Sequence, residues 1–120
     1  MYKIIFYTDT NGKSEIQEYI TNLRKKTNKD SKIKLNKITA YVNQLSKNGL
    51  IIGEPYIKHL EDEIWELRPL RDRIIFANCD INEFILLSHF VKKTQKTPRK
   101  EIERAKKILM EFKERGDSNE

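Results

Sequence analysis

The sequence of 120 residues contains one cysteine, Cys79, and two histidines. One cysteine cannot form an internal disulfide or, by itself, a cysteine-based zinc site, and this fits a reducing compartment. No apolar run approaches the roughly 20 residues that cross a bilayer, and the start MYKIIFYTDT lacks the basic segment and cleavage signal of a secretory peptide. We therefore expect a cytoplasmic protein with no membrane partner, no metal and no other cofactor.

The sequence also lacks internal repeats, a linker, a glycine-rich phosphate loop and a recognisable Ser/His/Asp arrangement. Its length corresponds to one domain, and its apolar residues fall in periodic segments, as they do in a globular protein. We expect a single domain over residues 1–115 and a disordered polar tail over residues 116–120.

Positive charge, in contrast, is abundant. The chain has 24 Lys and Arg residues against 18 Asp and Glu, a net charge of +6 and a pI near 9.4. Eight of these cations lie in HFVKKTQKTPRKEIERAKK, residues 89–107. Such a balance favours polyanions such as nucleic acid, although many lysine-rich surfaces bind nothing specific.

The first half of the sequence predicts one strand and two helices. KIIFYT, residues 3–8, is β-branched and aromatic, and a turn follows it. SEIQ, residues 14–17, has the form of a capping box and predicts an amphipathic helix to about Lys26. A second helix follows Asp30 or Ser31 and ends at Gly49, so that the two form an antiparallel helical hairpin.

The second half predicts strands and a last helix. From Tyr56 the period changes to two in YIKHL, IWELR, RIIFANC and EFILLSHFV, which indicates an antiparallel meander. Thr97 is expected to cap a helix that starts at Pro98 and ends at Gly116. The predicted fold class is α+β, in the order β-α-α-β-β-β-α, with an antiparallel sheet packed against the N-terminal hairpin and the C-terminal helix.

The hairpin WELRPLRDRIIF brings two arginines together. A four-residue turn at 69–72 would place Arg68 opposite Arg73. Alternation then predicts that the core side holds Trp65, Leu67, Ile74 and Phe76, and that the other side holds Glu66, Arg68, Arg73 and Ile75. Two facing guanidiniums are either neutralised by Glu66, in an ordinary network on a solvated sheet face, or available to an anion.

Three lysines follow the last expected strand, at a junction that could meet the same sheet face; they are Lys92, Lys93 and Lys96. The N-terminus of the last helix would itself favour a phosphate. The cations from Arg99 onward have a simpler explanation, a solvated helix face with Glu101 and Glu103 as partners.

Histidine is the side chain that titrates near neutral pH without perturbation, so His59 and His89 are candidates for an acid or a base. A structural role is the alternative for each. His89 is expected to share its strand face with Ile85, Leu87 and Val91.

Two segments, GEPYIKHLEDEIWELRPLRDRIIFANCD at 53–80 and ILLSHFVKKTQKTPRKEIERAKK at 85–107, resemble the phage-derived Gp49-like family of HigB toxins. This family lies within the RelE/ParE superfamily of type II toxin-antitoxin systems. The early FY and GKSEIQEYI agree with the first strand and helix of the family. The resemblance extends over nearly the whole chain.

The resemblance implies a RelE-like fold and ribosome-dependent cleavage of mRNA in the ribosomal A site. It also implies silencing by a HigA-type antitoxin with a helix-turn-helix domain, so that DNA would be contacted only indirectly, through the antitoxin complex. The reaction would be attack of an RNA 2′-hydroxyl on the adjacent phosphate without a metal. Arg68, Arg73 and Lys93 fall at basic catalytic positions, and Glu66, which stands where related toxins often have a lysine, or His89 is the candidate base. The residues expected to hold RNA phosphates are Lys92, Lys96, Arg71, Lys58 and Arg99.

Two other classes of function remain compatible with these residues. The superfamily includes ParE-type proteins that bind gyrase without cutting RNA, and a noncatalytic nucleic-acid-binding module would carry the same positive charge.

Overall fold

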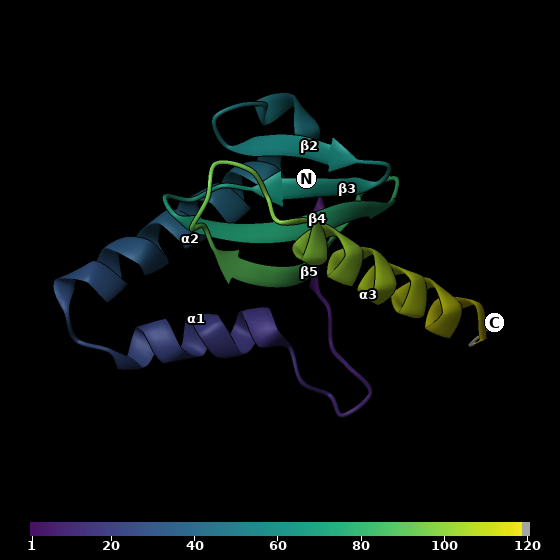
Figure 1. Cartoon of the computed structure of the whole chain (residues 1–120), viewed down its shortest axis with the longest axis horizontal. Helices are drawn as coiled ribbons and strands as arrows, with labels where there is room; N and C mark the ends of the chain where they lie inside the picture. The colour runs from purple at the N-terminus through teal and green to yellow at the C-terminus, as the bar shows by residue number, and fades with distance from the viewer. Residues whose placement is uncertain (119–120) are drawn as a thin grey trace.

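A computed structural model describes residues 1–118, in which five strands form one sheet in the order β1-β5-β4-β3-β2 (Figure 1). The strands are β1 Lys3–Phe6, β2 Ile57–Glu61, β3 Ile64–Leu67, β4 Asp72–Asp80 and β5 Glu83–Val91. The predicted α+β class is confirmed. The meander has one strand more than the predicted order, because β2 pairs with β3, with a register shift between His59 and Glu61. The sheet is mixed because β1 runs parallel to β5.

Two helices, α1 (Glu15–Lys25) and α2 (Lys29–Asn48), follow β1 and diverge from a short connection (Figure 1). Ser14 caps α1 as predicted, since its hydroxyl accepts from the backbone N–H of Gln17. The α2 helix begins earlier than predicted, because Asn28 provides the cap. Gly49 ends α2 at a φ of 67° and leads into a short 3₁₀ turn, η1 (Gly49–Ile52), that the sequence did not predict.

One core lies between the sheet and helices α1 and α2. It includes the predicted residues Leu67, Ile74 and Phe76, with Trp65 packed against it. The predicted hairpin register is also confirmed, because Leu67 pairs with Ile74 and Trp65 with Phe76.

The opposite face of the sheet is not solvated as the sequence suggested. Helix α3 (Arg99–Ser118) covers it and forms a second core with Ile75, Ala77, Ile85 and Leu87 (Figure 1). The alternation in the hairpin predicted a core on one side of the sheet only, yet the apolar stripe of α3 requires a partner of its own. The polar residues Glu66 and Arg73, which the alternation places on this face, are therefore buried.

A β-bulge in β5 corrects the predicted position of His89. The β4–β5 pairing shifts between Ile75 and Phe76, so that Leu87 is an additional residue in β5. Alternation inverts after such a bulge. His89 therefore lies on the α1 side of the sheet and does not share a face with Ile85 and Leu87.

Both ends of α3 differ from the prediction. The helix starts at Arg99, and the hydroxyl of Thr97, the predicted cap, donates to the Glu66 carboxylate instead. At the other end α3 continues past Gly116 to Ser118, while residues 119–120 of the predicted tail lie outside the described part of the chain. No helix within residues 1–118 is long and apolar enough to cross a membrane.

Candidate functional site

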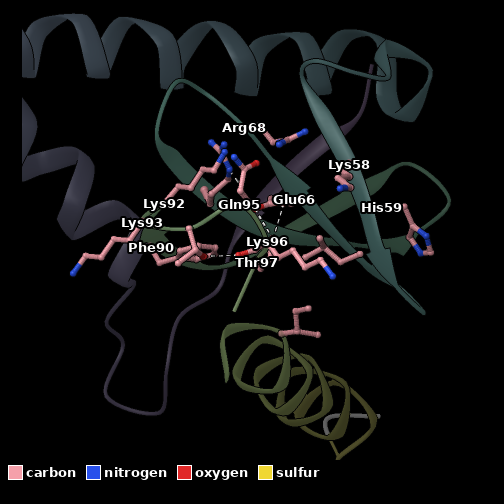
Figure 2. Close-up of a pocket in the computed structure, with 14 residues that line it drawn as sticks. Lys58, His59, Glu66, Arg68, Phe90, Lys92, Lys93, Gln95, Lys96 and Thr97 are labelled. Carbon is pink, nitrogen blue, oxygen red and sulfur yellow. Dashed lines mark hydrogen bonds and ion pairs between the residues drawn. The ribbon is translucent and has the colours of Figure 1, made fainter. Parts of the chain in front are cut away.

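A basic pocket of about 240 Å³ lies at one end of the sheet, where β3 ends, β4 begins and the chain leaves β5 for α3 (Figure 2). Its walls come from these strands, from β2 and from the loop at 92–97. The lining includes one carboxylate, Glu66, and six cationic side chains, which are Lys58, Arg68, Arg73, Lys92, Lys93 and Lys96. This excess of positive charge favours an anionic ligand.

A buried ion pair forms the floor of the basic pocket. The Nε of Arg73 lies 3.3 Å from an Oε of Glu66, and the two residues are only 5% and 3% exposed. Thr97 completes the arrangement, with its hydroxyl 3.0 Å from both carboxylate oxygens of Glu66 (Figure 2). Burial lowers the pKa of Arg73, the Glu66 charge opposes this shift, and the guanidinium stays protonated.

Arg73 also shapes the turn between β3 and β4. Its Nη1 donates to the carbonyl oxygens of Leu70 and Asp72, at 2.7 and 2.9 Å. The same guanidinium thus holds the backbone of the turn and the carboxylate of Glu66. Its removal would disturb both.

The side chain of Arg68 forms fewer hydrogen bonds and ion pairs than that of Arg73. Its Nε is buried and has no hydrogen-bond partner among residues 1–118. Both arginines line the basic pocket, and the positive charge of Arg68 contributes to the lowered pKa of Arg73. Both arginines thus lie at one pocket, and within the described residues Glu66 forms an ion pair with Arg73 but not with Arg68.

The cations of the basic pocket differ from those of α3 in their partners. Within residues 1–118, no ion pair with a carboxylate is formed by Lys58, Arg68, Lys92, Lys93 or Lys96. Most cations of α3, in contrast, form such pairs: Arg99 with Glu61 and Glu103, Arg104 with Glu15 and Glu101, Lys106 with Glu61 and Asp62, Lys113 with Glu63, and Arg115 with Glu111. These pairs agree with the prediction of a solvated helix face on which Glu101 and Glu103 are partners of the cations. Lys100 and Lys107 of α3 form no ion pair within the described residues.

The loop that carries the three lysines is fixed to the β3–β4 turn. The backbone N–H of Lys92 donates to the carbonyl of Arg71 at 2.8 Å, and the Arg71 side chain donates back to the Lys92 carbonyl at 2.9 Å. Within the loop, the Thr94 hydroxyl donates to the Lys96 carbonyl. Figure 2 shows Arg68 and Lys92 on one side of the basic pocket, while the Lys93 side chain extends outward.

The structure thus gathers most of the predicted site residues. Glu66, Arg68, Arg73, Lys93, Lys92, Lys96 and Lys58 all line the basic pocket. Arg71 lines an adjoining pocket, whereas Arg99 and His89 line neither. The contact of Thr97 with Glu66 was not predicted. The sequence offers no sign of it beyond a threonine that follows the three lysines.

His89 belongs to a separate network on the α1 side. Its ring stacks on Tyr19 with centroids 3.8 Å apart, and its Nε2 lies 3.0 Å from Oδ1 of Asp72. The Tyr19 hydroxyl donates to the same oxygen, at 2.7 Å. Burial alone would raise the pKa of Asp72, but the hydrogen bonds from His89 and Tyr19 lower it overall. Burial and the hydrogen bond to Asp72 raise the pKa of Tyr19.

Neither region is built as a metal centre. Among the described residues, no group of three or more His, Cys, Asp or Glu side chains is arranged to hold a metal ion.

The fold is similar to that of a solved structure. A chain of the YoeB–YefM complex from Staphylococcus aureus matches with a TM-score of 0.53 and 15% sequence identity, over 78% of this chain and 99% of that chain. At this identity the match shows a likeness of fold alone. No curated protein matches the sequence.

Family membership rests on a separate comparison. Residues 18–110 match the family described as "Phage derived protein Gp49-like". The match extends over well more than half of the chain, so the protein belongs to the Gp49-like family. The resemblance that the sequence indicated is thereby confirmed.

Proposed function

We propose that this protein is the toxin of a type II toxin-antitoxin system and that it cleaves mRNA in the ribosomal A site. The observation that carries the proposal is the basic pocket, where a buried Arg73–Glu66 pair lies among five cations that have no carboxylate partner within residues 1–118. Family membership and the RelE/YoeB fold support the same function. A HigA-type antitoxin would neutralise the toxin, in keeping with the structural likeness to a chain of the YoeB–YefM complex.

The reaction would use the chemistry of the RNA itself. The 2′-oxygen attacks the adjacent phosphorus, the bond from phosphorus to the 5′-oxygen breaks, and a 2′,3′-cyclic phosphate and a free 5′-hydroxyl result. The phosphorane that forms on the way carries one more negative charge than the phosphate. Arg68 and Arg73 would stabilise this charge, as preorganised cations do in other phosphoryl transfers.

Glu66 is the candidate that would accept the 2′-hydroxyl proton. It is the one carboxylate of the basic pocket, and Arg73 and Thr97 hold it in place. His89, the other candidate base, lines neither of the two pockets that adjoin the loop at 92–97. The leaving 5′-oxygen would take its proton from a lysine, for which Lys93 is the candidate, while Lys92 and Lys96 hold the RNA backbone.

The experiment that tests this function is primer extension on a reporter mRNA in a cell-free translation system, beside the same RNA without ribosomes. Wild type should cut within codons only when ribosomes are present. Arg68→Ala should reduce cutting about 100-fold, the usual order for loss of one stabilising donor. Arg24→Ala, an exposed arginine on α1, removes the same charge far from the basic pocket and should cut like wild type.

Two outcomes would overturn the proposal. Intact mRNA with inhibited DNA supercoiling would identify a ParE-like gyrase poison. RNA binding without any cutting would identify a noncatalytic binding module.

A further inference from the structure

A second pocket, which we call the flanking pocket, adjoins the basic pocket across the loop at 92–97. Its volume is about 440 Å³, within the range of about 300–1,000 Å³ typical of small-ligand sites. Both pockets are lined by Arg73, Lys92, Lys93, Thr94 and Gln95. Only the flanking pocket is lined by Leu70 and Arg71, so the two pockets share one basic wall and differ in the rest of their lining.

Leu70 is an unusual residue for its place. It occupies the β3–β4 turn at a φ of 57°, a left-handed conformation that favours glycine and asparagine, and its apolar side chain is 48% exposed. The surroundings impose this conformation, because Arg73 donates to the Leu70 carbonyl and the Asp72 N–H donates to Pro69 across the turn. Strain of this kind concentrates at functional sites.

We propose that the flanking pocket holds the nucleotide next to the reacting phosphate and that Leu70 packs on the face of its base. This inference rests on the proposed RNA cleavage and adds to it a subsite and a residue that determines specificity. Arg71, Lys92 and Lys93 supply positive charge for the next backbone phosphate, and Leu70 supplies the one large apolar surface among these cations. A nucleotide combines those two features, an anionic phosphate and a flat base whose faces are apolar.

The aliphatic side chain of Leu70 also predicts which kind of base the flanking pocket should prefer. An aliphatic side chain forms no hydrogen bonds with base edges, so it discriminates by the apolar area that it covers. A purine offers more of this area than a pyrimidine. The nucleotide in the flanking pocket should therefore be a purine more often than a pyrimidine.

The test is a map of cut positions on a mixture of mRNAs in cell-free translation, with wild type, Leu70→Gly and Ile81→Gly. Glycine accepts the positive φ of residue 70, so Leu70→Gly removes the side chain without straining the turn. Ile81 is 83% exposed in the β4–β5 turn and lines neither pocket, so Ile81→Gly is the matched control. Wild type and the control should favour a purine at one position beside the cut by roughly fivefold, the scale of apolar contact with part of a base.

Leu70→Gly should still cut, but with the purine preference at that position reduced to below about twofold. The subsite is overturned, with the proposed cleavage intact, if Leu70→Gly keeps the wild-type preference or if wild type shows none beside the cut. Absence of cuts with wild type overturns the proposed function and this inference together.

Discussion

At the scale of single residues, Arg73 and Glu66 form a buried ion pair and also belong to the proposed active site. Both are buried, and each would leave the other as an uncompensated charge if it were removed. The sequence analysis left open whether Glu66 neutralises the arginines or an anion does. In the structure Glu66 pairs with Arg73, whereas Arg68 has no carboxylate partner among residues 1–118.

Arg73→Ala should lower the free energy of unfolding by about 3–5 kcal/mol, the usual cost of breaking a buried ion pair. Urea denaturation measures this. The double variant Arg73→Met with Glu66→Met should recover much of the loss, because it removes the unpaired charge along with its partner. Equal stability of Arg73→Ala and wild type would contradict the buried pair.

Thr97→Val should weaken both stability and cleavage, because the Glu66 carboxylate loses the hydrogen bond that the Thr97 hydroxyl donates to it. A hydrogen bond to a charged group contributes about 1.5–3 kcal/mol, so thermal unfolding should report a clear decrease. Thr39→Val, at an exposed position of α2, makes the same isosteric change as a control. Restored cleavage in Thr97→Ser, which keeps the hydroxyl, would separate the hydrogen bond from the methyl group. An unaffected Thr97→Val would show that Thr97 does not position Glu66.

At the scale of elements, local patterns predicted the pieces and long-range contacts decided how they combine. The four-residue turn fixed the β3–β4 register correctly, since loop length constrains a hairpin. The bulge at Leu87 leaves no mark in the alternation of an apolar strand such as EFILLSHFV. For that reason His89 was placed on the wrong face, and its network with Tyr19 and Asp72 could not be foreseen.

The Asp72 network should make stability depend on acid pH. The folded-state pKa of Asp72 lies below its ordinary value near 3.9, so folding gains stability above about pH 4 and loses it as pH falls further. Thermal unfolding of wild type should therefore drop more between about pH 5 and pH 3 than that of Asp72→Asn. Glu114→Gln, an exposed carboxylate on α3, is the control and should follow wild type. Parallel curves for wild type and Asp72→Asn would contradict the assignment.

At the scale of the whole molecule, the sequence predicted the α+β class, the two N-terminal helices and the gathering of basic residues at one end of the sheet. It also predicted that the C-terminal helix packs against the sheet, but not which face the helix covers, because a single amphipathic stripe does not say which surface it meets. Nor could composition separate cations with carboxylate partners from cations without them. That separation depends on distances across the fold, such as Arg104 to Glu15 and Lys113 to Glu63.

The central claim is that the cations of the basic pocket, and not the overall positive charge, are responsible for the activity. The most direct measurement compares two double variants with the same net charge in the translation-coupled cleavage assay, Lys92→Gln with Lys93→Gln and Lys100→Gln with Lys107→Gln. The latter two lysines lie exposed on α3, outside the basic pocket. We expect the first variant to lose cleavage by about 100-fold and the second to cut like wild type. Equal losses in the two variants would contradict the claim and assign the effect to net charge.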